Sequence, residues 1–240
     1  MRKNTVKVDI KNAKMVAHRG VSGLERENTN AAFVAAGQRS YYGIETDVYR
    51  TADGHIVCIH DGNLERVAGV NLRMGDATLE QIQAVSMFDH DGKKRSDLIV
   101  PTLDEYIRIC AHYRKIGVLE LKDAFTEEEI CKIVDIIKEE GYLENIIFIS
   151  FNWDNLILLK KNYPDQPAQF LTGEITDELI AKLVENKLDI DAHFSYLTED
   201  NIKKMHDAGI TINCWTVDNP EDAERLDKWG VDQITSNILE

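Results

Sequence analysis

Residues 117–151, GVLELKDAFTEEEICKIVDIIKEEGYLENIIFISF, contain one complete strand–helix–strand unit. The apolar runs Gly117–Lys122 and Ile146–Phe151 have the length of buried strands. Between them, Thr126 and Glu129 form a capping-box pair that is typical of the start of a helix. A strand joined through a helix to the next strand predicts that the two strands lie parallel in one sheet.

The same alternation of strands and helices continues on both sides of this unit. Further strands are expected at Lys14–Ala17, Gly43–Val48, Ala168–Thr172, Leu188–Asp191, Ile210–Val217 and Asp232–Thr235. Together these make eight parallel strands, which predicts an α/β protein with a TIM (β/α)8 barrel. The chain has 240 residues, a usual length for one such barrel, so we expect a single domain over residues 1–240.

One more strand candidate, Ile56–His60, follows the turn signal Asp53-Gly54. If those two residues form the loop of a β-hairpin, Asp47 lies opposite His60 and the hairpin extends from the second barrel strand. A parallel placement of this segment is the alternative. Residues 62–101 have weak periodicity and several glycines, and we expect them to form a short excursion over one end of the barrel.

The composition limits what the chain can bind. Its formal net charge of −14 repels nucleic acid and anionic lipid headgroups, so no nucleic-acid partner is expected. It has no run of about 18 apolar residues, which argues against stable membrane insertion. The N-terminal segment MRKNTVKVDIKNAK lacks the apolar centre of a signal peptide, so the expected location is the cytoplasm. The four cysteines have no metal or disulfide spacing and are expected to be free thiols.

A polar triplet, His18-Arg19-Gly20, directly follows the first predicted strand. The C-terminal strand ends of a parallel barrel carry its function. A histidine at such an end can transfer protons near neutral pH, and an adjacent arginine can hold a phosphate through two N–H donors. The alternative is a histidine that is hydrogen-bonded for structural reasons only.

Two carboxylates, Glu45 and Asp47, end the second predicted strand. Residues two apart on a strand point to the same face, so the two negative charges repel each other and lose water together. A hard divalent cation removes that conflict, which predicts a metal site. The alternative is that both carboxylates face solvent at the end of the strand.

Two further charged pairs follow predicted strands. His60-Asp61 supplies a second histidine, which the hairpin would bring beside Asp47; the alternative is a turn in which Asp61 caps backbone N–H groups. Glu120 and Lys122 share one face of the strand that begins at Gly117. Glu120 is a candidate third metal ligand and Lys122 a candidate phosphate contact, or the two form a structural ion pair.

The order of these motifs, HRG, ExD, HD and ExK, matches a known pattern. It is carried by HRGVSGLERENTNAAF (18–33), IETDVYRTADGHIVCIHD (44–61), LELK (119–122) and CWTVDN (214–219). From about residue 14 to the C-terminus, the sequence resembles the glycerophosphodiester phosphodiesterase family. It departs from the family where a proline usually precedes ENT, because Arg26 stands there. This change is expected to loosen the loop without removing a catalytic group.

The resemblance implies a role for each candidate site residue. The general acid and base would be His18 and His60. One divalent cation, Mg²⁺ or Ca²⁺, would be held by Glu45, Asp47 and Glu120. Arg19 and Lys122 would contact the phosphate of the substrate. Phe151 and Trp215 would form apolar walls for its glycerol; the alternative is that these two side chains only pack in the core. Asn28 would order the loop after the first strand, and Asn237 would make a further polar contact.

The resemblance also implies the reaction, which is hydrolysis of a small-molecule glycerophosphodiester to sn-glycerol 3-phosphate and an alcohol. The attacking group would be water or the neighbouring glycerol hydroxyl, with His18 expected as the base and His60 as the acid. Two alternatives stay open: a sphingolipid or inositol-lipid phosphodiesterase of the same superfamily, and a module that binds metal and phosphate without turnover. The sequence does not specify the leaving alcohol, the metal or the oligomeric state.

Overall fold

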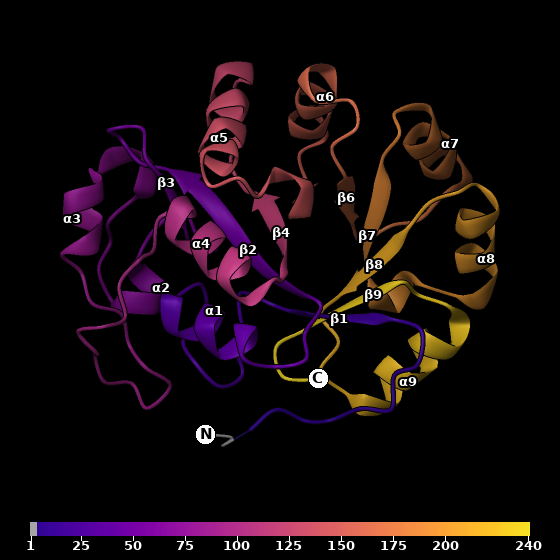
Figure 1. Cartoon of the computed structure of the whole chain (residues 1–240), viewed down its shortest axis with the longest axis horizontal. Coiled ribbons are helices and arrows are strands. Elements are labelled where there is room, and N and C mark those ends of the chain that lie inside the picture. Colours follow the sequence, from indigo (N-terminus) through magenta and orange to yellow (C-terminus); the bar gives the residue numbers. More distant parts are fainter. Residues whose placement is uncertain (1–3) are drawn as a thin grey trace.

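Eight parallel strands close into a barrel with helices around the outside (Figure 1). The computed structural model describes residues 4–240, so the first three residues of the expected domain lie outside it. Around the barrel the strands are β1 (Lys14–Ala17), β2 (Gly43–Arg50), β4 (Ile116–Leu121), β5 (Ile146–Ser150), β6 (Ala168–Thr172), β7 (Asp189–His193), β8 (Ile212–Trp215) and β9 (Gln233–Ser236). Since β1 pairs with both β2 and β9, the sheet is closed, and the predicted barrel is confirmed.

Helices return the chain between successive strands of the barrel. They are α1 (Asn30–Gly37), α4 (Leu103–Tyr113), α5 (Glu127–Glu139), α6 (Trp153–Asn162), α7 (Asp177–Glu185), α8 (Glu199–Asp207) and α9 (Pro220–Trp229), with the short turns η2 (Leu143–Asn145) and η3 (Phe194–Tyr196). The capping box of Thr126 and Glu129 starts α5 as predicted, and the isoleucines 130, 133 and 137 of that helix are buried against the strands. Within residues 4–240, no helix is long and apolar enough to cross a membrane.

The interior of the barrel is divided into an apolar and a polar part. The apolar part is a cluster contributed by β1, β4, β5 and β6: Val16, Val118, Ile147, Ile149 and Leu171. The polar part is contributed by β6 to β9 and consists of buried side chains: Gln169, Asp191, Asn213, Gln233 and Thr235. Asp191 lies level with Leu171 and with Asn213 in the strand register, so it shares their inward face.

The hairpin differs from its predicted register by one residue. β3 (Ile56–Cys58) runs antiparallel to β2, and Arg50 pairs with Ile56. The loop has three residues rather than two, because Thr51 N–H donates to the carbonyl of His55 at 2.9 Å. Gly54, at the end of the loop, has a φ of +82°, the left-handed conformation that such three-residue loops require.

The extra loop residue puts Ile59, not His60, opposite Asp47, and Ile59 N–H donates to the Asp47 carbonyl at 2.9 Å. The predicted pairing of Asp47 with His60 is therefore wrong, as is the parallel alternative. β3 ends at Cys58, and the chain leaves the strand ladder before His60. The conformation after the strand, rather than the ladder, thus sets the direction of the His60 side chain.

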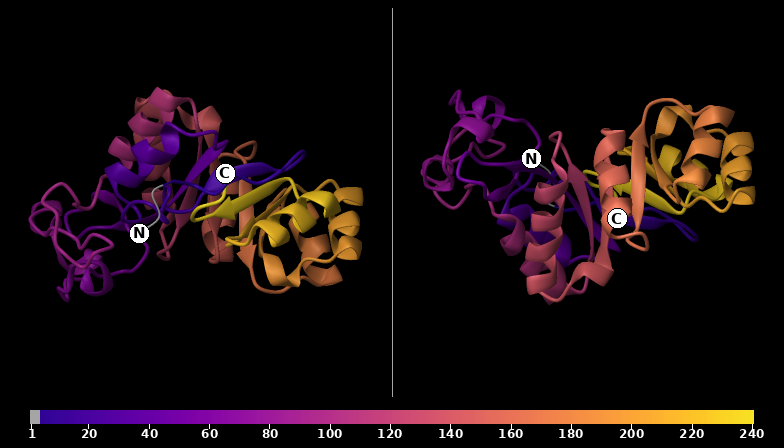
Figure 2. Two further views of the ribbon diagram at one scale, coloured as in Figure 1. Left: turned by 90° about the horizontal axis from the view of Figure 1, so that it is seen from below. Right: turned by 90° about the horizontal axis from the view of Figure 1, so that it is seen from above.

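The segment 62–101 forms an excursion beside the hairpin, at one end of the long axis of the molecule (Figure 2). It contains α2 (Glu65–Ala68), η1 (Met74–Asp76) and α3 (Leu79–Gln83). Its apolar side chains form a separate buried cluster, which includes Val57 and Ile59 of the hairpin segment. Arg26 joins the excursion to the loop after β1 by donating to the backbone carbonyls of Phe88 and Asp89. Arg26 therefore fastens the loop that the sequence was expected to leave loose.

Candidate active site

Three carboxyl groups meet at the C-terminal end of the barrel. Glu45 and Asp47 come from β2 and Glu120 from the adjacent strand β4, where Asp47 and Glu120 are register partners. All three are buried, and each offers an oxygen within 4.8 Å of the others. One oxygen of Asp47, Oδ1, accepts no hydrogen bond within residues 4–240.

The close approach of the three carboxyl groups changes their protonation. Burial and the charge of Asp47 raise the pKa of Glu120 to about 8, and the same causes raise the pKa of Glu45 well above its usual value. Burial would also raise the pKa of Asp47, but nearby positive charge, led by Arg19, outweighs it and lowers that pKa. The site thus lacks enough positive charge to keep all three groups ionised.

Two cations of the chain flank this cluster. Lys122 Nζ lies 3.1 Å from Glu120 Oε1 and 3.7 Å from Asp47 Oδ1. Arg19 Nε lies 3.5 Å from Asp47 Oδ2, and the Arg19 backbone N–H donates to Glu45 Oε2 at 2.7 Å. Both side chains are mostly buried, so water screens their charges weakly.

The backbone conformation around Arg19 limits which residue types can occupy the neighbouring positions. Arg19, Gly20 and Asn28 all have positive φ values, of 52°, 72° and 52°. A Cβ atom at Gly20 would lie 2.7 Å from the backbone of Ala32, so only glycine fits. Asn28 orders the loop, as expected, by donating from its backbone N–H to the Arg19 carbonyl at 3.0 Å. Its side chain also donates to Asp47 Oδ2 at 2.8 Å, which holds that carboxylate in place.

His18 is held by residues from the other end of the sequence. Its Nδ1 lies 2.7 Å from Asn237 Oδ1, and the amide of Asn237 donates to Asp218 Oδ2 at 2.6 Å. Because the amide nitrogen faces Asp218, the Asn237 oxygen faces His18, and Nδ1 must carry the proton. The free nitrogen, Nε2, points to the site, 4.0 Å from Glu45 Oε2. Burial, with a contribution from Arg19, lowers the pKa of His18 to about 4.

His60 is held by a different kind of partner. Its Nδ1 lies 2.7 Å from the carboxylate of Asp61, and its Nε2 accepts from Lys122 Nζ at 3.2 Å. Arg66 of α2 donates to the second oxygen of Asp61 at 2.6 Å and makes a two-pronged contact with Glu27 at 2.7 and 2.8 Å. Glu27 in turn accepts from Arg19 at 2.8 Å. A chain of charged groups therefore connects His60 to Arg19.

The acidic cluster opens into a small cavity of about 60 Å³. Its lining includes His18, Arg19, Glu45, His60, Glu120, Lys122, Phe151, Trp215 and Asp191. Phe151 and Trp215 meet edge to face at the rim, with ring centroids 5.6 Å apart. All nine residues that the resemblance singled out as catalytic, metal-binding or substrate-binding therefore lie together, with Asp47 buried beside the cavity.

The sequence interpretation missed several residues of the site. Asn237 was expected to make a polar contact, but its partner, His18, was not foreseen. Glu27 and Arg66, which are far apart in the sequence, form the bridge between Arg19 and Asp61, and their only signal was Glu27 in the ENT motif. Asp191 also lines the cavity, although it belongs to none of the motifs.

The acidic cluster fits a divalent cation. Its donors are all carboxylate oxygens, which suit hard cations such as Mg²⁺ and Ca²⁺. The unpartnered oxygen of Asp47 and the raised pKa values of Glu45 and Glu120 are the marks of a site that lacks a positive charge. Bound metal would supply that charge.

Fold and site together define a β/α-barrel protein with three carboxyl groups that could hold a metal ion, two histidines and two cationic side chains at one end. A sequence model described as the glycerophosphoryl diester phosphodiesterase family matches residues 18–239. The chain belongs to this family, as its motifs predicted.

Two related proteins and one solved structure match this chain over most of its length. A glycerophosphodiester phosphodiesterase of Caldanaerobacter subterraneus subsp. tengcongensis is 33% identical over 232 residues, which cover 93% of each protein. Another from Bacillus subtilis is 26% identical and covers 92% of this chain and 82% of its own length. The structure of an Oleispira antarctica phosphodiesterase in complex with the product sn-glycerol-3-phosphate superposes with a TM-score of 0.87. That protein is 26% identical, and the match covers 94% of this chain and 93% of the other.

Proposed function

We propose that this protein hydrolyses glycerophosphodiesters to sn-glycerol 3-phosphate and an alcohol, with the help of one divalent cation. The observation that carries the proposal is the convergence of two histidines, three carboxyl groups and two cations around one cavity in a member of this family. The sn-glycerol-3-phosphate bound to the related Oleispira antarctica enzyme supports the choice of product.

The cation would be Mg²⁺ or Ca²⁺, held by Glu45, Asp47 and Glu120. When bound, it would neutralise negative charge on the phosphate. Arg19 and Lys122 lie beside the same carboxylates, so their N–H groups would be available to the phosphate oxygens. Phe151 and Trp215 would form the apolar wall against the carbon atoms of the substrate.

The partners of the two histidines support different roles for them. His18 donates from Nδ1 to a neutral amide, and its lowered pKa keeps the ring uncharged and ready to accept a proton at Nε2. His60 instead has the carboxylate of Asp61 at its Nδ1 and the amine of Lys122, the proposed phosphate contact, at its Nε2. We therefore assign His18 as the base for the attacking hydroxyl and His60 as the acid for the leaving alkoxide.

A substrate panel with coupled detection of sn-glycerol 3-phosphate tests this function. Glycerophosphocholine, glycerophosphoethanolamine and glycerophosphoglycerol would be compared with a lysolipid and a sphingolipid, each with Mg²⁺, with Ca²⁺ and with EDTA. We expect release of sn-glycerol 3-phosphate from the soluble diesters, and loss of that release in EDTA. Full activity in EDTA would reject the cation, and release of choline phosphate would mean cleavage on the other side of the phosphorus. The cytoplasmic location stays a prediction.

A further inference from the structure

A buried carboxyl group on β7 has no part in the scheme above. Asp191 is 2% exposed, and its Oδ1 has no hydrogen-bond partner in the part of the chain that the structure describes. Buried polar atoms are nearly always paired, because an unpaired one gives up its bonds to water without replacement. An unpartnered oxygen that lines a ligand cavity therefore points to a partner that arrives with the ligand.

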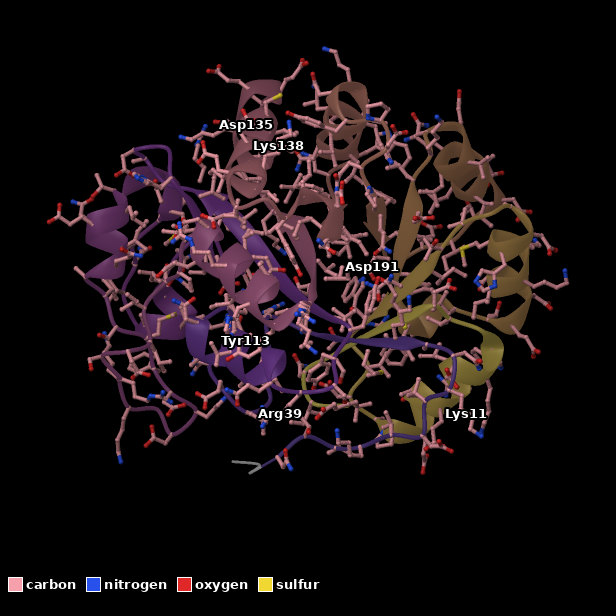
Figure 3. The ribbon with its side chains drawn as sticks, in the orientation of Figure 1. Lys11, Arg39, Tyr113, Asp135, Lys138 and Asp191 are labelled. Carbon is pink, nitrogen blue, oxygen red and sulfur yellow. The ribbon has the colours of Figure 1, made fainter. Side chains whose placement is uncertain are left out.

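The position of Asp191 in the barrel relates it to the metal-binding carboxylates. β7 is four strands from β2 in either direction around the barrel, so the two strands face each other across it. Asp191 and Glu45 line the same cavity from these opposite walls. Figure 3 labels Asp191 among the barrel strands and away from the outer helices. A substrate with its phosphate near β2 would extend its carbon atoms toward β7.

The surroundings of Asp191 suit a hydroxyl group better than a cation. Burial raises the pKa of Asp191 well above its usual value, which favours the protonated form of this carboxyl group. A neutral carboxyl group offers one O–H donor and one acceptor oxygen, which match the two functions of an alcohol. Trp215 Nε1 donates to the backbone carbonyl of Asp191 at 3.2 Å, so the indole that walls the cavity is fixed next to this carboxyl group.

We propose that Asp191 hydrogen-bonds the terminal hydroxyl of the substrate's glycerol and so selects glycerol over alcohols that lack this group. The proposal rests on the proposed function, whose phosphate site fixes the other end of the substrate. Asp191 would be a specificity-determining residue, because it contacts the substrate far from the reacting phosphorus. It would take no part in proton transfer.

The test compares two phosphoethanolamine diesters that differ by one oxygen atom. One carries glycerol, and the other carries propane-1,2-diol, which lacks the terminal hydroxyl but keeps the hydroxyl next to the phosphate. The metal-loaded wild type is expected to prefer the glycerol substrate by about 10- to 100-fold in kcat/KM. Without the terminal hydroxyl, the buried carboxyl group of Asp191 would have no hydrogen-bond partner. Asp191→Leu should reduce this preference to less than about threefold, whereas Asp191→Asn, which keeps a donor and an acceptor, should retain it.

A binding measurement on the wild type needs no variant. sn-Glycerol 3-phosphate should compete with substrate at least about tenfold more strongly than propane-1,2-diol 1-phosphate. Equal competition by the two compounds, or an unchanged preference in Asp191→Leu, would overturn the inference. If Asp191→Leu does not fold, as judged by its thermal melt, Asp191→Ala takes its place with the same expected loss.

The two proposals can fail separately. If the wild type releases no sn-glycerol 3-phosphate from any glycerophosphodiester, the proposed function is wrong. If it releases the product yet cleaves both test diesters with equal efficiency, the function stands and only the role of Asp191 is wrong.

Discussion

Replacing Glu27 by glutamine should destabilise the protein in a way that depends on pH. Glu27 is 16% exposed and accepts from both Arg66 and Arg19. Burial alone would raise its pKa, but these hydrogen bonds and charges outweigh burial and lower the pKa from 4.5 to about 2. At ~1.4 kcal/mol per pKa unit, this shift corresponds to about 3 kcal/mol. The partial exposure of Arg66 reduces the expected loss to about 2 kcal/mol at pH 7.

The sign of the pH dependence follows from the lowered pKa. The contribution of Glu27 is complete above its ordinary pKa of 4.5 and disappears as the pH falls through the folded value of about 2. The free energies of unfolding can be measured in urea, followed by tryptophan fluorescence. The difference between the wild type and Glu27→Gln should shrink by about 1 kcal/mol when the pH is lowered from 6 to 3.5.

The matched control is Glu185→Gln, which removes an exposed carboxylate at the end of α7. Its stability should stay within ~0.5 kcal/mol of the wild type at each pH. A difference between wild type and Glu27→Gln that is the same at pH 6 and pH 3.5 would refute the assigned role of the Glu27 charge.

Four further substitutions test the catalytic assignments. His18→Ala and His60→Ala should each lower turnover by about 10²- to 10⁴-fold with little change in the thermal melt, and either variant with more than half of the activity would reject the two-histidine scheme. Asp47→Asn should raise the metal concentration for half-maximal activity more than about tenfold, and a curve like that of the wild type would mean that Asp47 is not a ligand. Asn237→Leu should lower kcat about tenfold at nearly constant KM, because the His18 ring loses the partner that orients it; unchanged kcat would show that orientation comes from elsewhere.

The strands could be predicted because each local signal agreed with the fold. Buried parallel strands are short apolar runs. In a chain where such runs alternate with capped helices, a segment such as Ile146–Phe151 therefore indicates a buried strand. The polar motifs follow strands, and the ends of parallel strands meet at one rim, so their convergence also followed from the sequence.

The remaining details depend on geometry that local sequence does not determine. The hairpin loop has three residues rather than two because Gly54 can adopt the left-handed conformation at its end, and Asp-Gly is compatible with both loop lengths. The contact between His18 and Asn237 joins residues 219 positions apart and exists only because the barrel closes. Asp191 looks like any aspartate at the end of a strand until the register gives the direction of its side chain.

The contact made by Arg26 has a consequence for how this protein can change. Its guanidinium group reaches two main-chain carbonyls of the excursion rather than any side chain. Every amino acid carries a carbonyl, so substitutions at positions 88 and 89 leave the acceptors available. The attachment between the loop after β1 and the excursion can thus persist while the side chains at these two positions change.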